Sequence, residues 1–319
     1  MHKRLLNNAR LGIVLRPRGP ILVKSGIETP DPTRPGMEFV RTRHPLHGDM
    51  VYLPGTSLKG AIRSHAERIL HGLTVGVCDP LDGNDRCRKP KPISRGEPVT
   101  SAQVFRAQCA TCRTFGSLQL SGRVSLLDGY PYSGGDDDDE AVRTVAATNE
   151  TETRWQVGVD RKTGQAQGGA LFDLEVVVKG AFHTEVRLHN FQLWQLGLVA
   201  AVLRDMDDGD VPIGFGKARG LGQVAVDLTS LRFDSVSRGS GRLLGTAELC
   251  REDERQDYDL HSEDAVDCPA GVSADATWRG TRFEAKGDAL GELLGAVVDG
   301  PLASFVTTWQ KRPARRARR

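Results

Sequence analysis

The sequence predicts an α+β fold with the ferredoxin-like order of elements. Apolar and polar residues alternate as in strands near residues 9–24, 122–131 and 170–188. Apolar residues recur at helical spacing after Gly55 and again over 190–206. The order of elements is therefore strand, helix, strands, helix and strand, which fits a ferredoxin-like domain with long insertions.

The first of these elements is the region 9–24, "ARLGIVLRPRGPILVK", which we interpret as two strands joined by a Pro/Gly turn. Residues 25–50 contain four prolines and three glycines, so we expect a flexible loop without regular structure there. The stretch "VYLPGTSLKGAIRSHAERIL" then enters a helix, because apolar residues recur every three or four positions from Leu58 to Ile69.

The start of this helix carries a candidate binding site. Thr56 or Ser57 is a suitable N-cap, because its hydroxyl can accept a hydrogen bond from a free N–H of the first turn. Lys59 and Arg63 lie four residues apart and share a second stripe of the helix. Free N–H groups, hydroxyls and cations together suit an anion. The alternative is an ordinary capped helix with a solvated basic face.

The later segments differ in composition. Residues 72–115 form an insertion that carries four of the six cysteines. Residues 132–168 are polar and glycine-rich, and we expect a long hairpin or an irregular loop there. Two strands flank the Lys179-Gly180 turn, and a glycine-rich turn enters a strand over 212–228.

The chain divides by composition into a main domain at 1–228, a variable C-terminal segment at 229–306 and a basic tail at 307–319. The tail holds six of the 43 basic residues, so the net charge of +2 for the whole chain becomes −4 without it. Acidic runs at 136–140 and 251–267 account for much of this negative charge, and the chain without the tail and these two runs is basic. Such segregated charge favours an anionic partner for one surface.

Composition also predicts a cytoplasmic protein that makes no membrane contact. Hydrophobic residues make up 39% of the 319 residues and charged residues 26%, which is typical of soluble globular proteins. The longest apolar run, 196–203, is too short to cross a bilayer. Asn7, Asn8 and Arg10 interrupt the N-terminal region where a signal peptide would be apolar.

The clustered cysteines of the insertion predict a structural zinc site. They are Cys78, Cys87, Cys109 and Cys112. The last two form a C-x-x-C pair, "CATC", whose tight turn places two thiolates on one metal. In a cytosolic chain four clustered thiols favour zinc over disulfides, and the alternatives are a redox dithiol or unrelated free cysteines. Cys250 and Cys268 lie far away and are free thiols or one exposed pair.

The stretch "GFGKARGLGQV" is a candidate phosphate-binding turn. Its glycines let the backbone approach a phosphate closely, and Lys217 and Arg219 add positive charge. It is neither a Walker A loop nor a dinucleotide fingerprint, because it enters a strand and no helix follows it. The alternative is a bulged hairpin with solvated cations.

Three stretches together resemble one family. "YLPGTSLKGAIRS" (52–64), "VGVDRKTGQAQGGALFDLEVVVKGAFH" (157–183) and "IGFGKARGLGQV" (213–224) are similar, in this order, to motifs of RAMP-superfamily proteins. The resemblance is to the backbone subunits of type III CRISPR effector complexes and extends over residues 8–228. It implies an RRM-related palm, a thumb-like hairpin at 132–168 and a zinc-binding insertion.

The resemblance also implies partners and contacts. Members of this family bind CRISPR guide RNA, hold complementary target RNA and assemble with other subunits, including copies or homologues of themselves. Carried over by position, the guide-RNA contacts fall on Thr56, Ser57, Lys59, Arg63, Gly216, Lys217, Arg219 and Gly220. In the hairpin, Trp155 is a candidate stacking residue, or else a core residue.

Whether the chain is an endoribonuclease stays open. The family's RNA-cleaving subunits carry an aspartate where this chain has Gly36, in "GMEFVR". Glycine can neither orient a 2′-hydroxyl nor accept its proton. Asp31 is therefore the candidate catalytic residue, with Glu38 as the alternative, and a divalent metal is a candidate cofactor. An alternative outside this class is a zinc-stabilised protein-interaction module whose acidic insertions bind basic partners.

Overall fold

The structure is a computed structural model, and it describes residues 4–26, 35–45, 47–83, 86, 87, 90, 98–239 and 241–311. The candidate catalytic residue Asp31 and the arginines of the basic tail lie outside these described residues.

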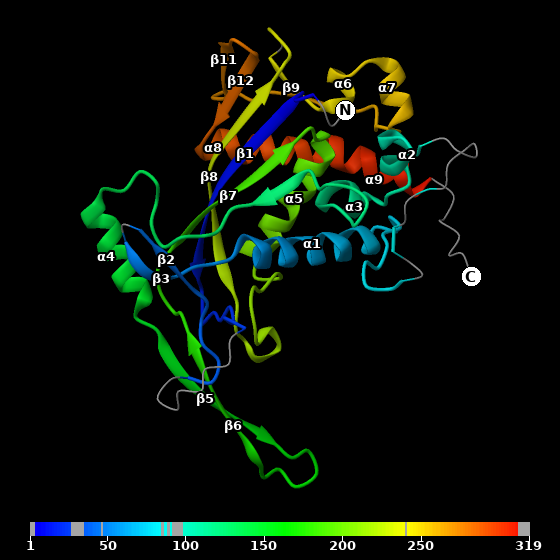
Figure 1. Cartoon of the computed structure of the whole chain (residues 1–319). Helices are drawn as coiled ribbons and strands as arrows, with labels where there is room; N and C mark the ends of the chain where they lie inside the picture. The colour runs from blue at the N-terminus through cyan, green and yellow to red at the C-terminus, as the bar shows by residue number, and fades with distance from the viewer. Residues whose placement is uncertain are drawn as a thin grey trace.

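The centre of the molecule is an antiparallel sheet of six strands in the order β11-β12-β8-β1-β7-β4 (Figure 1). In chain order these strands are β1 (Asn7–Pro17), β4 (Val124–Leu126), β7 (Phe182–His189), β8 (Val224–Ser235), β11 (Ser273–Thr277) and β12 (Gly280–Ala285). Strand β1 lies between β7 and β8, with Leu11 opposite both Val186 and Leu231. The predicted α+β class is confirmed.

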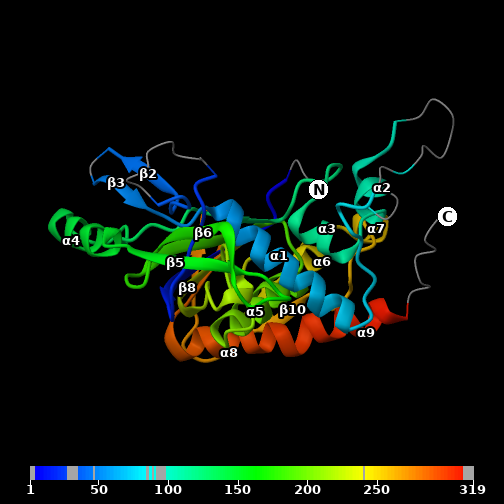
Figure 2. The ribbon, with the colours of Figure 1, turned by 90° about the horizontal axis from the view of Figure 1, so that it is seen from below.

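Helices cover one face of this sheet (Figure 2). They are α1 (Gly55–Gly72), α5 (Leu193–Asp207) and α8 (Gly287–Val297). Helix α5 lies between the other two and is buried almost all round, which explains its nearly continuous apolar sequence. Period-two alternation in β1 matches this arrangement, because Ala9, Leu11 and Ile13 are buried under the helices whereas Arg10 and Arg16 are exposed.

Two expectations for the first fifty residues are wrong. The segment after Pro17 does not pair with β1 as a second strand, and Ile21 and Lys24 make only isolated bridges, to Val177 and Phe39. The segment 25–50 contains a regular hairpin of β2 (Arg41–His44) and β3 (Gly48–Val51). Three of its four prolines precede this hairpin, so the turn signal applies to the first part alone.

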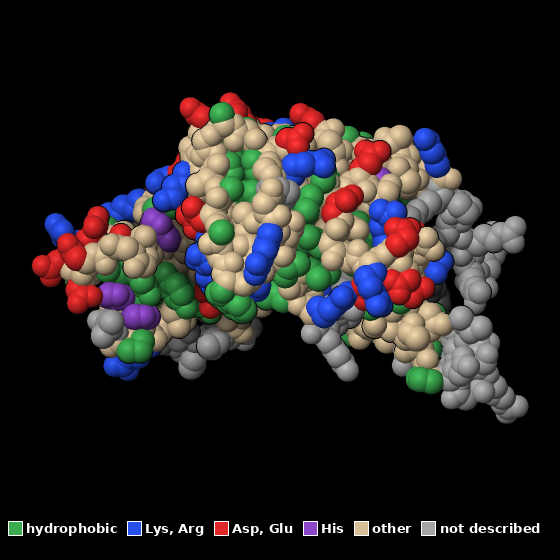
Figure 3. All heavy atoms as spheres, turned by 90° about the horizontal axis from the view of Figure 1, so that it is seen from above, with side chains coloured by type: hydrophobic (Ala, Val, Ile, Leu, Met, Phe, Trp, Pro, Cys, Tyr) green, Lys and Arg blue, Asp and Glu red, His purple; other side chains and the backbone are tan. Residues whose placement is uncertain are grey.

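The segment 132–168 holds a helix as well as a hairpin. Helix α4 (Asp138–Asn149) begins where the Asp137 carboxylate accepts a hydrogen bond from the Glu140 N–H at 2.8 Å. The acidic run therefore favours a helix start, a signal that the sequence interpretation missed. Strands β5 (Glu152–Val159) and β6 (Ala166–Val176) then form a hairpin that extends away from the body (Figure 1). Acidic side chains gather at the end of the molecule where α4 lies (Figure 3).

The C-terminal segment belongs to the same body as the main domain. Strands β11 and β12 extend the central sheet, and α8 packs on α5 and β8. A π-helical turn, η2 (Val298–Leu302), contains Pro301 and leads into α9 (Ala303–Gln310), where Phe305 stacks on Trp194 at 3.8 Å. By length and composition alone the run Gly287–Gln310 could cross a membrane, and 44% of its most apolar window is buried inside the protein.

Short elements complete the chain. They are α2 (Ser101–Arg106), α3 (Ala110–Phe115), η1 (Lys217–Arg219), β9 (Arg242–Leu244), α6 (Thr246–Leu249), α7 (Glu252–Asp257) and β10 (Ala265–Asp267). Helices α2 and α3 lie in the cysteine-bearing insertion, and η1 lies in the glycine-rich turn.

Candidate nucleic-acid interface and metal centre

The four cysteines of the insertion converge at the N-terminus of α3. The Sγ atoms of Cys78, Cys87, Cys109 and Cys112 all lie within 4.8 Å of one another, and all four residues are buried. The Cys109 N–H donates to the Cys87 Sγ at 3.2 Å, and the Cys112 N–H donates to the Cys109 Sγ at 3.5 Å. Backbone N–H groups aimed at sulfur stabilise thiolates, the form that binds metals.

The sulfur spacing suits a tetrahedral metal ion. The Cys78 Sγ lies 3.5 Å from the Cys112 Sγ and 3.6 Å from the Cys109 Sγ, close to the roughly 3.8 Å that Zn–S bonds of about 2.3 Å would give. Hydrogen bonds from the Cys112 and Cys78 thiols lower the pKa of Cys109 to about 7, and the same bonds raise the pKa values of Cys78 and Cys112. Crowded thiols therefore cannot all ionise unaided, and a bound cation would remove that obstacle.

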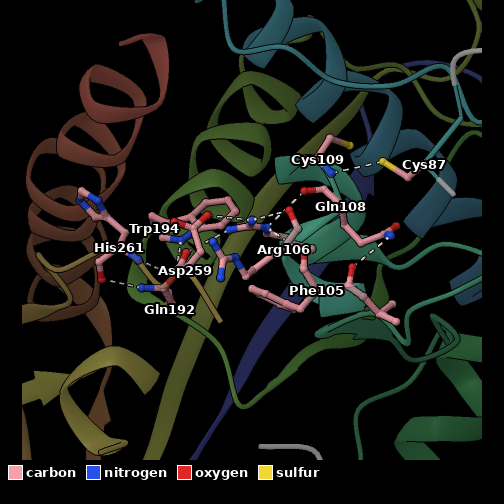
Figure 4. A network of polar contacts seen from close by, with 11 residues as sticks. Cys87, Phe105, Arg106, Gln108, Cys109, Gln192, Trp194, Asp259 and His261 are labelled. Carbon is pink, nitrogen blue, oxygen red and sulfur yellow. Dashed lines mark hydrogen bonds and ion pairs between the residues drawn. The ribbon is translucent and has the colours of Figure 1, made fainter. Parts of the chain in front are cut away.

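A buried arginine joins this insertion to the C-terminal segment, and Figure 4 labels its partners Phe105, Arg106, Gln108 and Asp259. Arg113 is 2% exposed, and its guanidinium donates to the backbone carbonyls of Phe105, Arg106 and Gln108 at 3.1–3.2 Å. It also donates to the backbone carbonyl and the carboxylate of Asp259, at 3.2 and 3.1 Å. Its partners lie in α2, in the loop before α3 and in the loop after α7, so this side chain fixes the insertion against the body.

Helix α1 begins differently from the sequence prediction. Its N-cap is Pro54, whereas Thr56 and Ser57 lie exposed in the first turn. The Gly55 N–H donates to the Asp128 carboxylate at 2.7 Å, so a side chain from another segment replaces the predicted cap. A Cβ at Gly55 would lie 2.4 Å from the Leu126 carbonyl oxygen, which explains the glycine. One N–H of the predicted anion site is thus already used.

The glycine-rich turn folds back beside this helix. Gly214 and Gly216 have φ of 74°, which favours glycine, and a Cβ at Gly216 would lie 2.6 Å from the Leu221 side chain. The Phe215 N–H donates to the Leu22 carbonyl at 2.7 Å, which fixes the turn against the segment after β1. The glycine-rich segment therefore forms a turn, and this turn contains the single 3-10 helical turn η1.

The start of α1 and the glycine-rich turn line one open cavity of about 430 Å³, which we call the groove. Its lining residues are Val23, Lys24, Ser57, Gly60, Ala61, Gly214, Phe215 and Lys217. Burial and the nearby Arg68 lower the pKa of Lys217, so Arg68, which shares the Ser57 face of α1, also lies close to the groove. Among the described residues, no carboxylate forms an ion pair with Lys24, Arg68 or Lys217.

The other candidate contacts lie outside this lining. Arg63 donates to Glu67 and to the Gly116 carbonyl, both at 3.0 Å, and its Nη2 lies 3.8 Å from the Cys112 Sγ. Thr56 and Lys59 point away because they lie on other faces of α1; burial and then Arg63 lower the pKa of Lys59.

Two candidates in the glycine-rich turn also lie beside the groove. Arg219 reaches the β5–β6 hairpin, where it donates to the Gln156 side chain at 3.1 Å and lies over the Phe172 ring at 5.0 Å. Gly220 has φ of 78° at the end of η1 and is exposed.

A model of the RAMP superfamily matches residues 15–225, well over half of the chain, and this range includes both turns and all four clustered cysteines. The chain belongs to the RAMP superfamily. A search of curated proteins found no match to this RAMP protein. Membership implies a CRISPR-associated protein that binds RNA as part of a multi-subunit complex.

Sequence reasoning missed three residues of this RAMP protein that shape the two sites. Lys24 lies 5.0 Å from the centre of the Phe215 ring, Arg68 lies on the groove face of α1, and Arg113 is the buried hub of the insertion. The spacing of Arg68, eleven residues or three turns after Ser57, could have been found from helical periodicity. Lys24 and Arg113 carry no local signal, because tertiary contacts alone determine their roles.

Proposed function

We propose that this RAMP protein is the guide-RNA-binding backbone subunit of a type III CRISPR effector complex, acting in the cytoplasm and holding guide RNA together with complementary target RNA. The observation that carries the proposal is the groove, where two segments more than 150 residues apart bring together glycine backbone and cations that form no ion pair with any residue that the structure describes. Cations and N–H groups bind phosphates without reading bases, which suits a subunit that must hold any guide sequence.

The topology supports the proposed palm and thumb. The elements β1, α1, β4, β7, α5 and β8 follow one another in the chain. Insertions that carry β2–β3, α2–α3 and α4–β5–β6 lie between them, and the four palm strands lie in the order β8-β1-β7-β4. This is the order of a ferredoxin-like palm. The β5–β6 hairpin exposes Trp155, Val157 and Val159 on one face, together with Leu171 on the neighbouring strand. An exposed apolar stripe on a projecting hairpin suits contact with RNA bases or a neighbouring subunit, as expected of a thumb.

Zinc is the metal we propose for the cysteine cluster. Four thiolates at tetrahedral spacing are a closed donor set, so the ion would be structural. The residues holding it would be Cys78, Cys87, Cys109 and Cys112. Because Arg63 links this cluster to α1, we propose that Arg63 acts as a positioning residue rather than as a direct phosphate contact.

Target-RNA cleavage is a second candidate function. Asp31 lies outside the described residues, but Gly36, five residues later in the sequence, donates its N–H to the Asp173 carboxylate at 2.9 Å. A carboxylate therefore lies beside the position where cleaving relatives are expected to have one. Guide-loaded complex with a divalent metal should cut complementary RNA at regular intervals, and loss of the cuts in Asp31→Ala or Asp173→Asn would assign the residue. Cuts that persist in both variants would place the chemistry elsewhere.

The binding proposal is tested with Lys24→Ser/Lys217→Ser. We expect weaker binding of a fluorescent single-stranded RNA, and a plot of log affinity against log salt whose slope decreases by about 1.4, or about 0.7 per lost charge. The matched control is Lys179→Ser/Arg242→Ser, which removes two cations outside the groove that pair with Glu150 and Asp267. Equal binding by variant and control would contradict the proposal. Purified protein without nucleic-acid absorbance or heparin retention would favour the protein-interaction module.

A further inference from the structure

The face of the central sheet opposite the helices carries a row of arginines. The register places Arg10 of β1 directly opposite Arg187 of β7 on one side and Arg232 of β8 on the other. Neighbouring strands in a sheet lie about 5 Å apart, so the Cα atoms of the three arginines lie on one line of about 10 Å across the strands. We call this line the arginine row. It lies on the opposite face of the sheet from α1, α5 and α8, and thus away from the groove.

Like charges directly opposite one another destabilise a sheet, so this arrangement needs an explanation. Arg187 pairs with Glu185 on its own strand. Arg232 lies 3.4 Å from the Asp234 carboxylate, yet its buried Nε makes no hydrogen bond. Arg10 is exposed and forms no ion pair with any described residue. Positive charge is therefore in excess, and burial together with Arg187 and Arg10 lowers the pKa of the nearby His189.

Two cavities flank the arginine row and share Arg10 and Arg232. The larger, about 510 Å³, is also lined by Asn8, His189 and Arg282. The smaller, about 260 Å³, is also lined by Ser230 and Lys286 and by two carboxylates, those of Glu185 and Glu284. The row is thus the ridge between two hollows, and a strand crossing it could contact both.

Asp234 holds the neighbouring guanidinium groups in place. The Arg282 Nε donates to its carboxylate at 2.7 Å, and Arg279 lies 3.9 Å away. Arg279 also donates to the Asn8 side-chain oxygen at 2.8 Å. These contacts fix the donors before a ligand arrives, which lowers the entropy cost of binding.

An aromatic side chain stands at the rim of the larger cavity. Trp278 lies at the tip of the β11–β12 hairpin and is 89% exposed, and it lines the same cavity as Arg279. An exposed indole beside guanidinium groups provides a stacking surface for a base next to donors for phosphates. An acidic peptide would use the arginines but would leave this indole without a role.

We propose that the arginine row and Trp278 form a second binding surface, for a single-stranded nucleic acid, on the sheet face opposite the groove. The guanidinium groups would contact phosphates and Trp278 would stack on a base. The surface goes beyond the guide-binding role, because one chain could then hold two strands on opposite faces. RNA and DNA share the chemistry that this surface recognises.

The test uses the whole chain and eight-nucleotide fluorescent RNA and DNA oligonucleotides. We expect two oligonucleotides per wild-type chain, and for Arg10→Thr/Arg232→Thr we expect weaker binding of one of them, with a salt slope at the sheet site lower by about 1.4. Threonine suits an exposed strand position. The control Arg242→Thr/Arg251→Thr removes two exposed arginines of β9 and the start of α7, and should bind like the wild type. Comparison of the RNA and DNA arms shows which strand the surface prefers.

Trp278→Ser provides an independent variant, because an 89%-exposed hairpin tip cannot be required for folding. It should weaken the sheet site about tenfold and reduce the binding-induced quenching of tryptophan fluorescence. One oligonucleotide per wild-type chain, or unchanged binding by both sheet variants, would overturn the proposal. The groove variant Lys24→Ser/Lys217→Ser separates the two proposals, since it should lose the other oligonucleotide and leave the sheet site intact.

Binding of an acidic peptide such as poly-glutamate at the arginine row, with no binding of the RNA or DNA oligonucleotide there, would also overturn the proposal of a nucleic-acid surface.

Discussion

Arg63 and Arg68 lie on the same helix and carry the same charge, but α1 presents them to different surroundings. Arg63 faces the cysteine cluster, where Glu67 and the Gly116 carbonyl accept its hydrogen bonds. Arg68 lies on the face of the groove, near Lys217, with no carboxylate partner among the described residues. A paired cation stabilises the fold, whereas an unpaired cation beside another is available for an anionic ligand. The role of each cation is therefore determined by whether the fold places a hydrogen-bond acceptor or carboxylate beside it.

The largest expected effect tests the cluster itself. Cys112→Ser should abolish stoichiometric zinc binding and lower the unfolding temperature by about 10 °C or more, because the insertion depends on the ion for folding free energy. Metal analysis and thermal unfolding measure this. Cys250→Ser is the control, since Cys250 is a half-buried thiol outside the cluster. If Cys112→Ser were fully stable without metal, the cysteine cluster would not be a structural metal site, and Arg63 would not support the fold through it.

Arg113→Met should have the next largest effect, about 3–5 kcal/mol in the free energy of unfolding. The substitution removes the Arg113 donor from four backbone carbonyls and from the Asp259 carboxylate. The exposed Arg106→Met, seven residues earlier, should change stability by less than about 0.5 kcal/mol. Denaturant unfolding of both variants measures the difference, and equal stability would show that the network of Figure 4 is not what holds the insertion.

The direct comparison is Arg63→Ala against Arg68→Ala. Arg63→Ala should cost about 2 kcal/mol of stability and weaken zinc binding about tenfold, with RNA affinity unchanged. Arg68→Ala should leave stability within about 0.5 kcal/mol and lower the salt slope of RNA binding by about 0.7. Unfolding, metal competition and RNA titration on the same two proteins measure all four quantities. If both variants lost RNA affinity equally, the division of α1 into two faces would be wrong.

The sequence was sufficient where local pattern and final contacts agree. The stripe from Leu58 to Ile69 and the apolar run of α5 are periodic, so their helices could be predicted. The C-x-x-C pair likewise indicated the cysteine cluster, whose four sulfur atoms the fold brings together. The convergence of the two turns followed from a resemblance, because no local feature relates Ser57 to Lys217.

The errors arose where distant contacts override local preference. The predicted cap hydroxyls of Thr56 and Ser57 stay exposed because Asp128, more than 70 residues later, takes the cap position. Lys59 and Arg63 share a stripe, as predicted, but that stripe faces α3 and not the groove. Helix α4 was missed because acidic residues were interpreted as a charged loop and not as a helix start.

Arg41 and Glu175 extend the comparison to a third cation and give the smallest expected effect. Glu175 accepts hydrogen bonds from the Arg41 side chain and the Phe39 N–H, the latter at 2.8 Å, and Phe39 pairs with Lys24 at the groove wall. Burial acts to raise the pKa of Glu175, but the hydrogen bonds from Arg41, Thr151 and Phe39 outweigh it and the pKa is lowered.

A lowered carboxyl pKa stabilises the fold above the unfolded-state value of about 4.3, and that contribution is lost as the pH falls through the folded-state value. Glu175→Gln should therefore cost about 1 kcal/mol at pH 7, and the difference from wild type should shrink toward pH 3. Unfolding measured across this range checks both statements. A difference independent of pH would mean that Arg41 does not hold the ionised carboxylate. In that case packing would fix the segment beside Lys24. The ion pair with Glu175 would then not explain why Arg41 has a structural role whereas Lys24 is available to bind RNA.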